Sequence, residues 1–208
     1  MIITYHGQAF VKLQQGDLTL AFNPISKDSK SKPTRFGADI ALISLNGPDF
    51  NGLDEVSRGD KVPFAVTGPG EYEVNNIFIQ GFSSVGDSEK INTIYTVTLD
   101  GIRLCHLGAI KSLELDADVT EEIGAVDVLF VPIGGGTVLS PKEAAKLATS
   151  FEPKIVIPVM AETSDKDGGA LKLFMKELGG GETTVDKLTI KKRDLEGKED
   201  ELVIIKQT

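Results

Sequence analysis

The chain has little cysteine or histidine, no tryptophan and no long apolar stretch. Its 208 residues include one cysteine, Cys105, and two histidines, His6 and His106. A single cysteine excludes an intrachain disulfide, and no apolar run approaches the ~18 residues that a membrane-spanning helix needs. The first residues lack a charged leader followed by an apolar stretch, so we expect no signal peptide. Absence of disulfides is typical of the reducing cytoplasm, the compartment that we predict.

Positive charge is also scarce. The chain has 22 lysine and arginine residues against 31 aspartate and glutamate residues, which gives a net charge of −9. An acidic protein repels phosphate backbones, and the lysine-rich stretches 27–35 and 187–193 contain no interleaved aromatic residues. We interpret both stretches as solvated surface and expect neither nucleic acid nor membrane as a partner. The possible partners that remain are an unidentified small molecule, another protein or a second copy of the chain.

The composition that is present predicts a globular chain. Hydrophobic residues make up 40% and charged residues 25% of the sequence, proportions that are typical of a protein with a buried core. No linker is long enough to divide the chain. Residues 1–208 are therefore predicted to form a single domain.

The first half of the sequence is predicted to be mainly strands. Apolar runs at 10–13 and 18–22 flank a glycine-containing turn, which predicts a hairpin. The stretch 38–44 is almost continuously apolar, as in a strand that is covered on both faces. Apolar runs bounded by turn residues predict further strands at 64–67, 77–82, 93–99 and 102–106, with a polar loop at 83–92.

The second half alternates strands with helices. Ser140 can cap a helix over 140–150, in which Pro141 takes the first position and Glu143 completes a capping box. Further helices are predicted at 118–124 and 170–178, and strands at 126–133, 154–159, 185–191 and 202–206. Two β-α-β units that follow the hairpins predict an α/β (α+β) fold, in which two mixed sheets pack face to face with helices outside.

Four segments at the ends of predicted strands carry the polar candidates. These segments are 5–9 with His6 and Gln8, 44–53 with Asn46 and Asp49, 105–109 with His106, and 157–160 with Met160. Ligand sites in such sheets lie at strand ends. We therefore expect the strands that end at Ser44, His106 and Met160 to meet at one edge.

The order and context of these segments resemble the metallo-β-lactamase fold superfamily. Within it, the chain is most similar to the ascorbate-6-phosphate lactonase-like metal-dependent hydrolases, a likeness that Gly68–Val74 and Asn92–Tyr95 share. The resemblance covers nearly the whole chain. It implies a four-layer αββα sandwich and, in ordinary members, hydrolysis at a metal centre.

The resemblance also implies seven metal-ligand positions, and only Asp49 and His106 keep a donor among them. At the other five positions stand Leu45, Gly47, Phe50, Ala109 and Met160. None of these side chains suits zinc or manganese, whereas a catalytic zinc normally takes three protein ligands. The resemblance therefore predicts no bound metal, no other cofactor and no metal-activated water.

We favour a non-hydrolytic pseudoenzyme that binds a ligand or partner in the former active-site crevice. The alternative is a hydrolase of the superfamily, lactonase-like or phosphoesterase-like, with a reduced or metal-independent site. Its catalytic candidates are His6, Asp49 and His106, because histidine and aspartate can exchange protons within hydrogen-bond reach. A structural or oligomer-forming protein without a small ligand is a third possibility. The candidate binding residues are Gln8, Asn46, Glu71 and Met160.

Each candidate also has a purely structural explanation. His106 ends an apolar strand and can be a hydrogen-bonded core histidine, and His6 can orient a loop. Asp49 can cap a short helical stretch that begins at Gly52. Glu71 follows a Gly-Pro-Gly turn and is expected at the surface.

Overall fold

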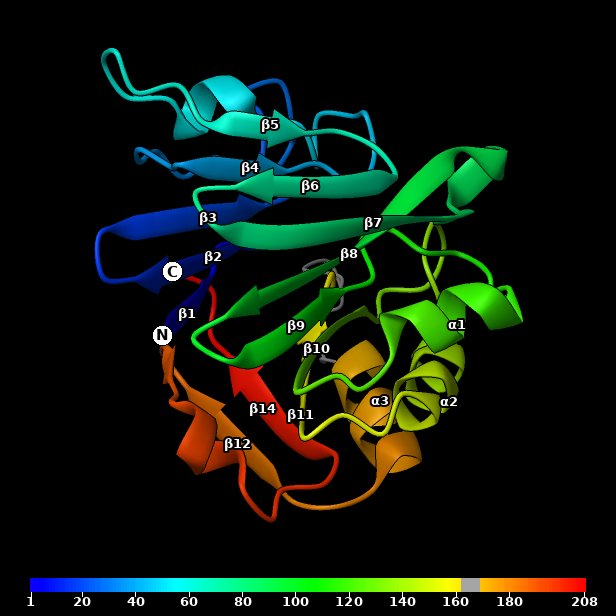
Figure 1. Ribbon diagram of the computed structural model, residues 1–208. Coiled ribbons are helices and arrows are strands. Elements are labelled where there is room, and N and C mark those ends of the chain that lie inside the picture. The colour runs from blue at the N-terminus through cyan, green and yellow to red at the C-terminus, as the bar shows by residue number, and fades with distance from the viewer. Residues whose placement is uncertain (162–168) are drawn as a thin grey trace.

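The computed structural model describes residues 1–161 and 169–208 of the protein. In these residues two β-sheets pack face to face, and three α-helices lie against the outer face of one sheet (Figure 1). This arrangement confirms the predicted fold class of two mixed sheets flanked by helices.

The smaller sheet has six strands in the order β13-β1-β2-β3-β4-β5. They are β1 (Ile2–Tyr5), β2 (Val11–Gln15), β3 (Leu18–Phe22), β4 (Ile40–Leu42), β5 (Phe64–Val66) and β13 (Leu188–Thr189). The hairpin strands β2 and β3 are antiparallel, whereas β3, β4 and β5 run parallel, so this sheet is mixed.

The larger sheet has eight strands in the order β12-β14-β11-β10-β9-β8-β7-β6. They are β6 (Gly70–Val74), β7 (Ile77–Val85), β8 (Ile91–Leu99), β9 (Ile102–His106), β10 (Val128–Pro132), β11 (Ile155–Val159), β12 (Glu182–Val185) and β14 (Glu201–Ile205). Pairing is antiparallel from β6 to β9 and parallel from β9 to β12. The parallel part therefore brings the carboxyl ends of β9, β10 and β11 to one edge.

Helices cover the parallel part of the larger sheet. They are α1 (Ala117–Ile123), α2 (Pro141–Ser150) and α3 (Gly169–Leu178). Leu147 of α2 and Phe174 of α3 join one apolar cluster with Leu129 of β10. The capping box of Ser140 and Glu143 is present as predicted. On the smaller sheet, the outer apolar side chains meet the 3₁₀-helix η1 (Leu53–Val56) and the loop that precedes β4.

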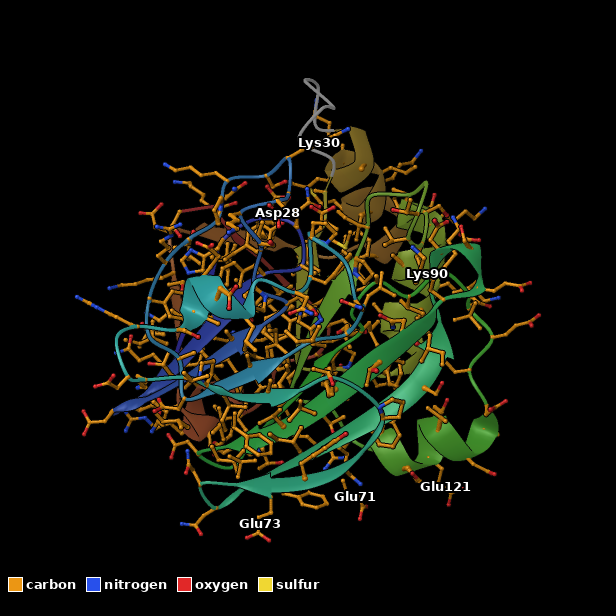
Figure 2. The ribbon with its side chains drawn as sticks, turned by 90° about the horizontal axis from the view of Figure 1, so that it is seen from above. Asp28, Lys30, Glu71, Glu73, Lys90 and Glu121 are labelled. Carbon is orange, nitrogen blue, oxygen red and sulfur yellow. The ribbon has the colours of Figure 1, made fainter. Side chains whose placement is uncertain are left out.

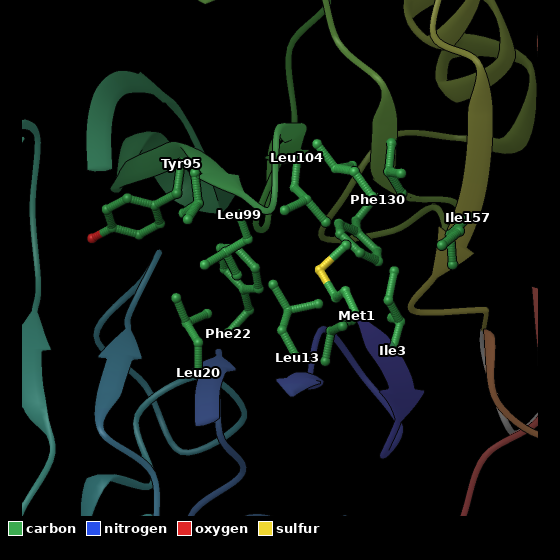
Figure 3. Packing of buried hydrophobic residues seen from close by; sticks show 14 of the residues in the cluster. Met1, Ile3, Leu13, Leu20, Phe22, Tyr95, Leu99, Leu104, Phe130 and Ile157 are labelled. Carbon is green, nitrogen blue, oxygen red and sulfur yellow. The ribbon is translucent and has the colours of Figure 1, made fainter. Parts of the chain in front are cut away.

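The main core lies between the two sheets (Figure 3). Leu13 and Phe22 of the smaller sheet belong to the same buried cluster as Leu104 and Phe130 of the larger sheet. The hydroxyl of Tyr95 on β8 donates a hydrogen bond of 2.9 Å to a main-chain carbonyl just after β4. Apolar burial and this buried hydrogen bond fix the two sheets against each other.

Parts of the sequence prediction need correction. The predicted strand 185–191 is wrong: Val185 ends β12 in the larger sheet, and Leu188 begins β13 in the smaller sheet. The loop predicted at 83–92 is shorter, because β7 extends to Val85 and β8 starts at Ile91. Strands β1, β6 and β12 were also not predicted. Short or polar edge strands give weak periodic signals, and alternation does not reveal a crossing between sheets.

Candidate functional site

The predicted strand ends do meet, and the side chains that meet there are apolar. Ala9, Phe50, Ala109 and Val138 form one buried cluster, against which Leu45 and Met160 pack. We call these six residues the crevice cluster. It joins the segments that follow β4, β9, β10 and β11. The strands that end at Ser44, His106 and Met160 therefore meet at one edge, as expected.

A cavity of about 210 Å³ opens beside this cluster, and we call it the crevice. Its lining residues are Leu45, Asn46, Gly47, Pro48, Asp49, Phe50, Asp87, Lys90, Ala109 and Thr137. They come from the segment after β4, the hairpin between β7 and β8, and the segments that follow β9 and β10. Most of the positions where the resemblance implies metal ligands therefore face or adjoin this one cavity.

His106 is fully buried, and both of its ring nitrogens have partners in the chain. Nδ1 lies 2.9 Å from the main-chain nitrogen of Gly108, which can only donate, so Nδ1 accepts. Nε2 then carries the proton and donates to the carbonyl of Ala9 at 3.0 Å. The ring also stacks on Phe22 and Phe130. Burial lowers the pKa of His106 to about 3, although the bond to Ala9 opposes this shift. His106 is thus a hydrogen-bonded core histidine.

Two buried asparagines hold neighbouring segments in the same way. Asn92 accepts a hydrogen bond of 2.7 Å from the nitrogen of Ala109 and donates to the carbonyl of Leu107 at 2.9 Å. Asn23 accepts a hydrogen bond of 2.7 Å from the nitrogen of Ser44. We call Asn23, Asn92 and His106 the hydrogen-bonded layer. Sequence reasoning missed the role of Asn92, although the resemblance already included the segment Asn92–Tyr95 of this strand.

Asp49 is half-buried at the crevice. Its Oδ1 accepts a hydrogen bond from the hydroxyl of Ser29. The predicted helix-capping role is wrong, because η1 follows Gly52 without any side-chain cap. The Asp49 carboxylate is engaged by the loop that precedes β4 instead.

His6 lies among different neighbours. Its Nδ1 is 2.9 Å from the hydroxyl of Thr208 and its Nε2 is 3.2 Å from the hydroxyl of Thr4. Burial, with a smaller effect of the nearby Lys12 charge, lowers the pKa of His6 to about 4. Among the described residues, no hydrogen bond or ring contact joins His6 to Asp49 or His106. The three predicted catalytic residues are therefore not brought into one hydrogen-bonded set.

Gln8 and Met160 are brought together through the main chain. The carbonyl of Gln8 accepts hydrogen bonds from the nitrogen of Met160 at 2.9 Å and from the Tyr5 hydroxyl at 2.8 Å. Both residues have positive φ, 48° and 55°, a conformation that is uncommon for side chains other than glycine. This link fixes the Met160 end of β11 against the segment before β2.

The other two binding candidates lie apart. Asn46 lines the crevice, where its Oδ1 accepts a hydrogen bond of 3.2 Å from Asn51. Glu71 is exposed on the edge strand β6 and accepts a bond of 3.4 Å from Gln80. Figure 2 shows Glu71 well away from Lys90, which lines the crevice. A binding role for Glu71 remains a prediction, at a place other than the crevice.

Residues 1–161 and 169–208 contain no group of three or more His, Cys, Asp or Glu side chains that could hold a metal ion. None of the helices in these ranges is long and apolar enough to cross a membrane.

Comparison with known proteins supports the fold and the resemblance. Residues 2–160 match the family described as Beta-lactamase superfamily domain. A UPF0173 metal-dependent hydrolase of Bacillus velezensis is 24% identical over 215 residues, covering 87% of this chain and 94% of its own. Another, from Carboxydothermus hydrogenoformans, is 26% identical over 228 residues, covering 89% of this chain and 100% of its own. A Thermotoga maritima structure, described as a candidate Zn-dependent hydrolase of the metallo-β-lactamase superfamily, has a TM-score of 0.80 and 25% identity, with 100% and 99% coverage.

Proposed function

Because the chain belongs to the Beta-lactamase superfamily domain family, we propose that it is a member that keeps the fold without a catalytic metal centre. In this proposal it is a pseudoenzyme that binds a ligand or partner in the crevice. The observation that carries the proposal is the crevice cluster. The resemblance implies metal ligands at five positions where the sequence has none. The side chains at four of these positions are apolar and pack together.

The residues at these positions do not fit a metal ion. Leu45, Phe50 and Ala109 offer no lone pair, and the thioether of Met160 is a poor ligand for zinc or manganese. A dication beside such side chains loses hydration without gaining ligands. The two donors that remain are engaged by the chain itself, His106 through both ring nitrogens and Asp49 through Ser29.

We further propose that residues 1–208 form a single domain. The last strands complete both sheets, since β13 pairs with β1 and β14 pairs with β11. We also propose that the protein is located in the cytoplasm, because a chain with one cysteine has no intrachain disulfide. Cys105 is buried, and burial raises its pKa to about 12, so it is a poor nucleophile and redox group.

The names of the relatives favour a second candidate, a hydrolase of the superfamily. The Bacillus velezensis and Carboxydothermus hydrogenoformans proteins are both named metal-dependent hydrolases. These names support hydrolysis more directly than they support a pseudoenzyme, which rests on the side chains of the crevice. A hydrolase of this kind would use Asp49 at the crevice, with a reduced ligand set or with none.

Rebuilding the missing ligands separates the two candidates. The variant carries L45H, G47H, F50H, A109D and M160H. Gly47 accepts a side chain readily, because its φ is not positive and a Cβ there meets no atom within 4 Å. Zinc at 100 times its Kd stabilises a folded protein by about 2.7 kcal/mol, which raises the melting temperature by roughly 5–10 °C at this chain length.

We expect zinc to stabilise the rebuilt variant and not the wild type. Zinc-dependent stabilisation of the wild type, together with chelator-sensitive hydrolysis of a lactone or phosphoester, would establish the hydrolase instead. If the rebuilt variant folds but zinc does not raise its melting temperature, the crevice is not a former metal site.

A further inference from the structure

We propose that the ligand of the crevice is a small zwitterion with an apolar side chain, of the class of the apolar α-amino acids. This inference rests on the proposed function, because it takes the crevice as a ligand site without a metal. It adds the chemistry of the ligand, which follows from the floor, the size and the charges of the crevice.

The floor of the crevice is apolar. Leu45, Phe50 and Ala109 line the cavity and also belong to the crevice cluster. An apolar group that displaces water from this floor is stabilised in proportion to the area that it covers. The cavity measures about 210 Å³, which is below the roughly 300–1,000 Å³ of pockets that hold drug-sized ligands. This space suits a molecule of the size of one amino acid.

The rim carries charges of both signs. Asp49 reaches the cavity from the segment after β4, and Asp87 and Lys90 reach it from the hairpin between β7 and β8. The ion pairs within the described ranges involve other residues, so neither carboxylate is paired with Lys90. Asp49 and Asp87 accept hydrogen bonds from the hydroxyls of Ser29 and Ser88. These hydroxyls carry no charge and leave both carboxylates without a counter-ion.

Opposite charges that line one small cavity without pairing select for a ligand that carries both. The ammonium group of a zwitterion can pair with Asp49 while its carboxylate pairs with Lys90. A ligand with a single charge meets a like charge on the rim: an amine alone faces Lys90, and a carboxylate alone faces Asp49 and Asp87. Asn46 and Thr137 add neutral hydrogen-bonding groups to the same lining.

The test uses the full chain after removal of metals with a chelator, and L-leucine as the probe. Isothermal titration calorimetry should give a Kd of about 1 mM or tighter for leucine. Three matched probes each lack one feature: isocaproate lacks the ammonium, isopentylamine lacks the carboxylate and glycine lacks the apolar side chain. Each should bind at least about tenfold more weakly, the factor that corresponds to about 1.4 kcal/mol.

Variants locate the binding. K90Q and D49N should each weaken leucine binding by about tenfold, since each removes one charge pair. The amide oxygen that D49N introduces still accepts a hydrogen bond from Ser29, so this variant removes the charge and keeps the loop contact. The control is K142Q. Lys142 lines a separate cavity of about 570 Å³ beside α2, so this variant should leave the affinity for leucine unchanged.

Three results would overturn the inference: no leucine binding by the folded protein, equal binding of isopentylamine or isocaproate, or unchanged leucine affinity in K90Q. The metal content of the same preparation before chelation separates the two proposals. A metal-free protein that does not bind leucine contradicts only the zwitterion. One zinc per chain contradicts the proposed function and this inference with it.

Discussion

The hydrogen-bonded layer and the crevice cluster lie side by side but consist of opposite chemistry. Asn23, Asn92 and His106 are polar, fully buried and bonded to the main chain of the segments at the crevice. The crevice cluster is apolar throughout. Ala109 belongs to the second and is held by the first, because its nitrogen donates to Asn92.

This difference separates the contacts that shape the loops of the site from the side chains that line it. The hydrogen-bonded layer shapes the loops through main-chain atoms, so it works with any side chains at the crevice. Leu45, Phe50, Ala109 and Met160 of the crevice cluster stand at positions where the resemblance implies metal ligands, and none of the four side chains carries an oxygen or nitrogen donor. A fold can therefore keep its site-forming loops while the chemistry of the site changes.

The largest effect is expected in the hydrogen-bonded layer. His106→Ala leaves the carbonyl of Ala9 and the nitrogen of Gly108 without their partner and opens a cavity between Phe22 and Phe130. We expect a loss of about 4 kcal/mol in the free energy of unfolding, measured with urea. The comparison variant His6→Ala removes a ring that packs on Phe10 and Phe36 and is bonded to two side-chain hydroxyls, and it should cost less than His106→Ala. A cost below about 1 kcal/mol for His106→Ala would contradict the role of this layer.

Acid should weaken the same layer. The pKa of His106 falls from 6.5 to about 3 on folding, and that of His6 to about 4. Between pH 6.5 and 4 the unfolded state therefore binds protons that the folded state rejects, so stability is complete above pH 6.5 and declines as the pH falls. His106 alone should account for about 3 kcal/mol of this loss.

The control for this acid effect is the His106→Ala variant. Its stability should decline less steeply with acid, so that the two pH curves approach each other. Parallel curves would show that His106 binds its proton over the same pH range in the folded and unfolded states, so that folding does not lower its pKa.

Truncation in the crevice cluster should cost less. Phe50 is 8% exposed and borders an open cavity, so Phe50→Ala should lower the unfolding free energy by about 2 kcal/mol, below the usual range for a core phenylalanine. Leu45→Ala, at a half-buried position, should cost about 1 kcal/mol. Urea unfolding of both variants beside His106→Ala tests the ranking. A cost for Phe50→Ala above that of His106→Ala would reverse the comparison.

Sequence patterns predicted the fold better than the contacts of the site. The capping box at Ser140 and the hairpin strands β2 and β3 depend on neighbours in the chain, and local signals identify them. The division between β12 and β13 depends on which sheet each segment joins. That choice is made by contacts with β14 and β1, which are distant in sequence.

The same limit applies to the candidate site. The resemblance indicated which ligand positions lack donors, but not that Leu45, Phe50, Ala109 and Met160 pack on one another. The partner of Asp49 is Ser29, 20 residues away, and that of His106 is Ala9, 97 residues away. No periodicity in the sequence reports such pairs. The helix cap, one of two roles left open for Asp49, is wrong, whereas the contacts of His106 agree with its explanation as a core histidine.

The metal content of the wild-type protein tests the central claim most directly. The protein is purified without a chelator, in parallel with the rebuilt variant, and both are examined by elemental analysis for zinc, manganese and iron. Apolar side chains at the crevice predict far less than one metal ion per chain in the wild type and a clear gain in the variant. A wild-type protein that carries close to one ion per chain, lost on mutation of Asp49, would contradict the account.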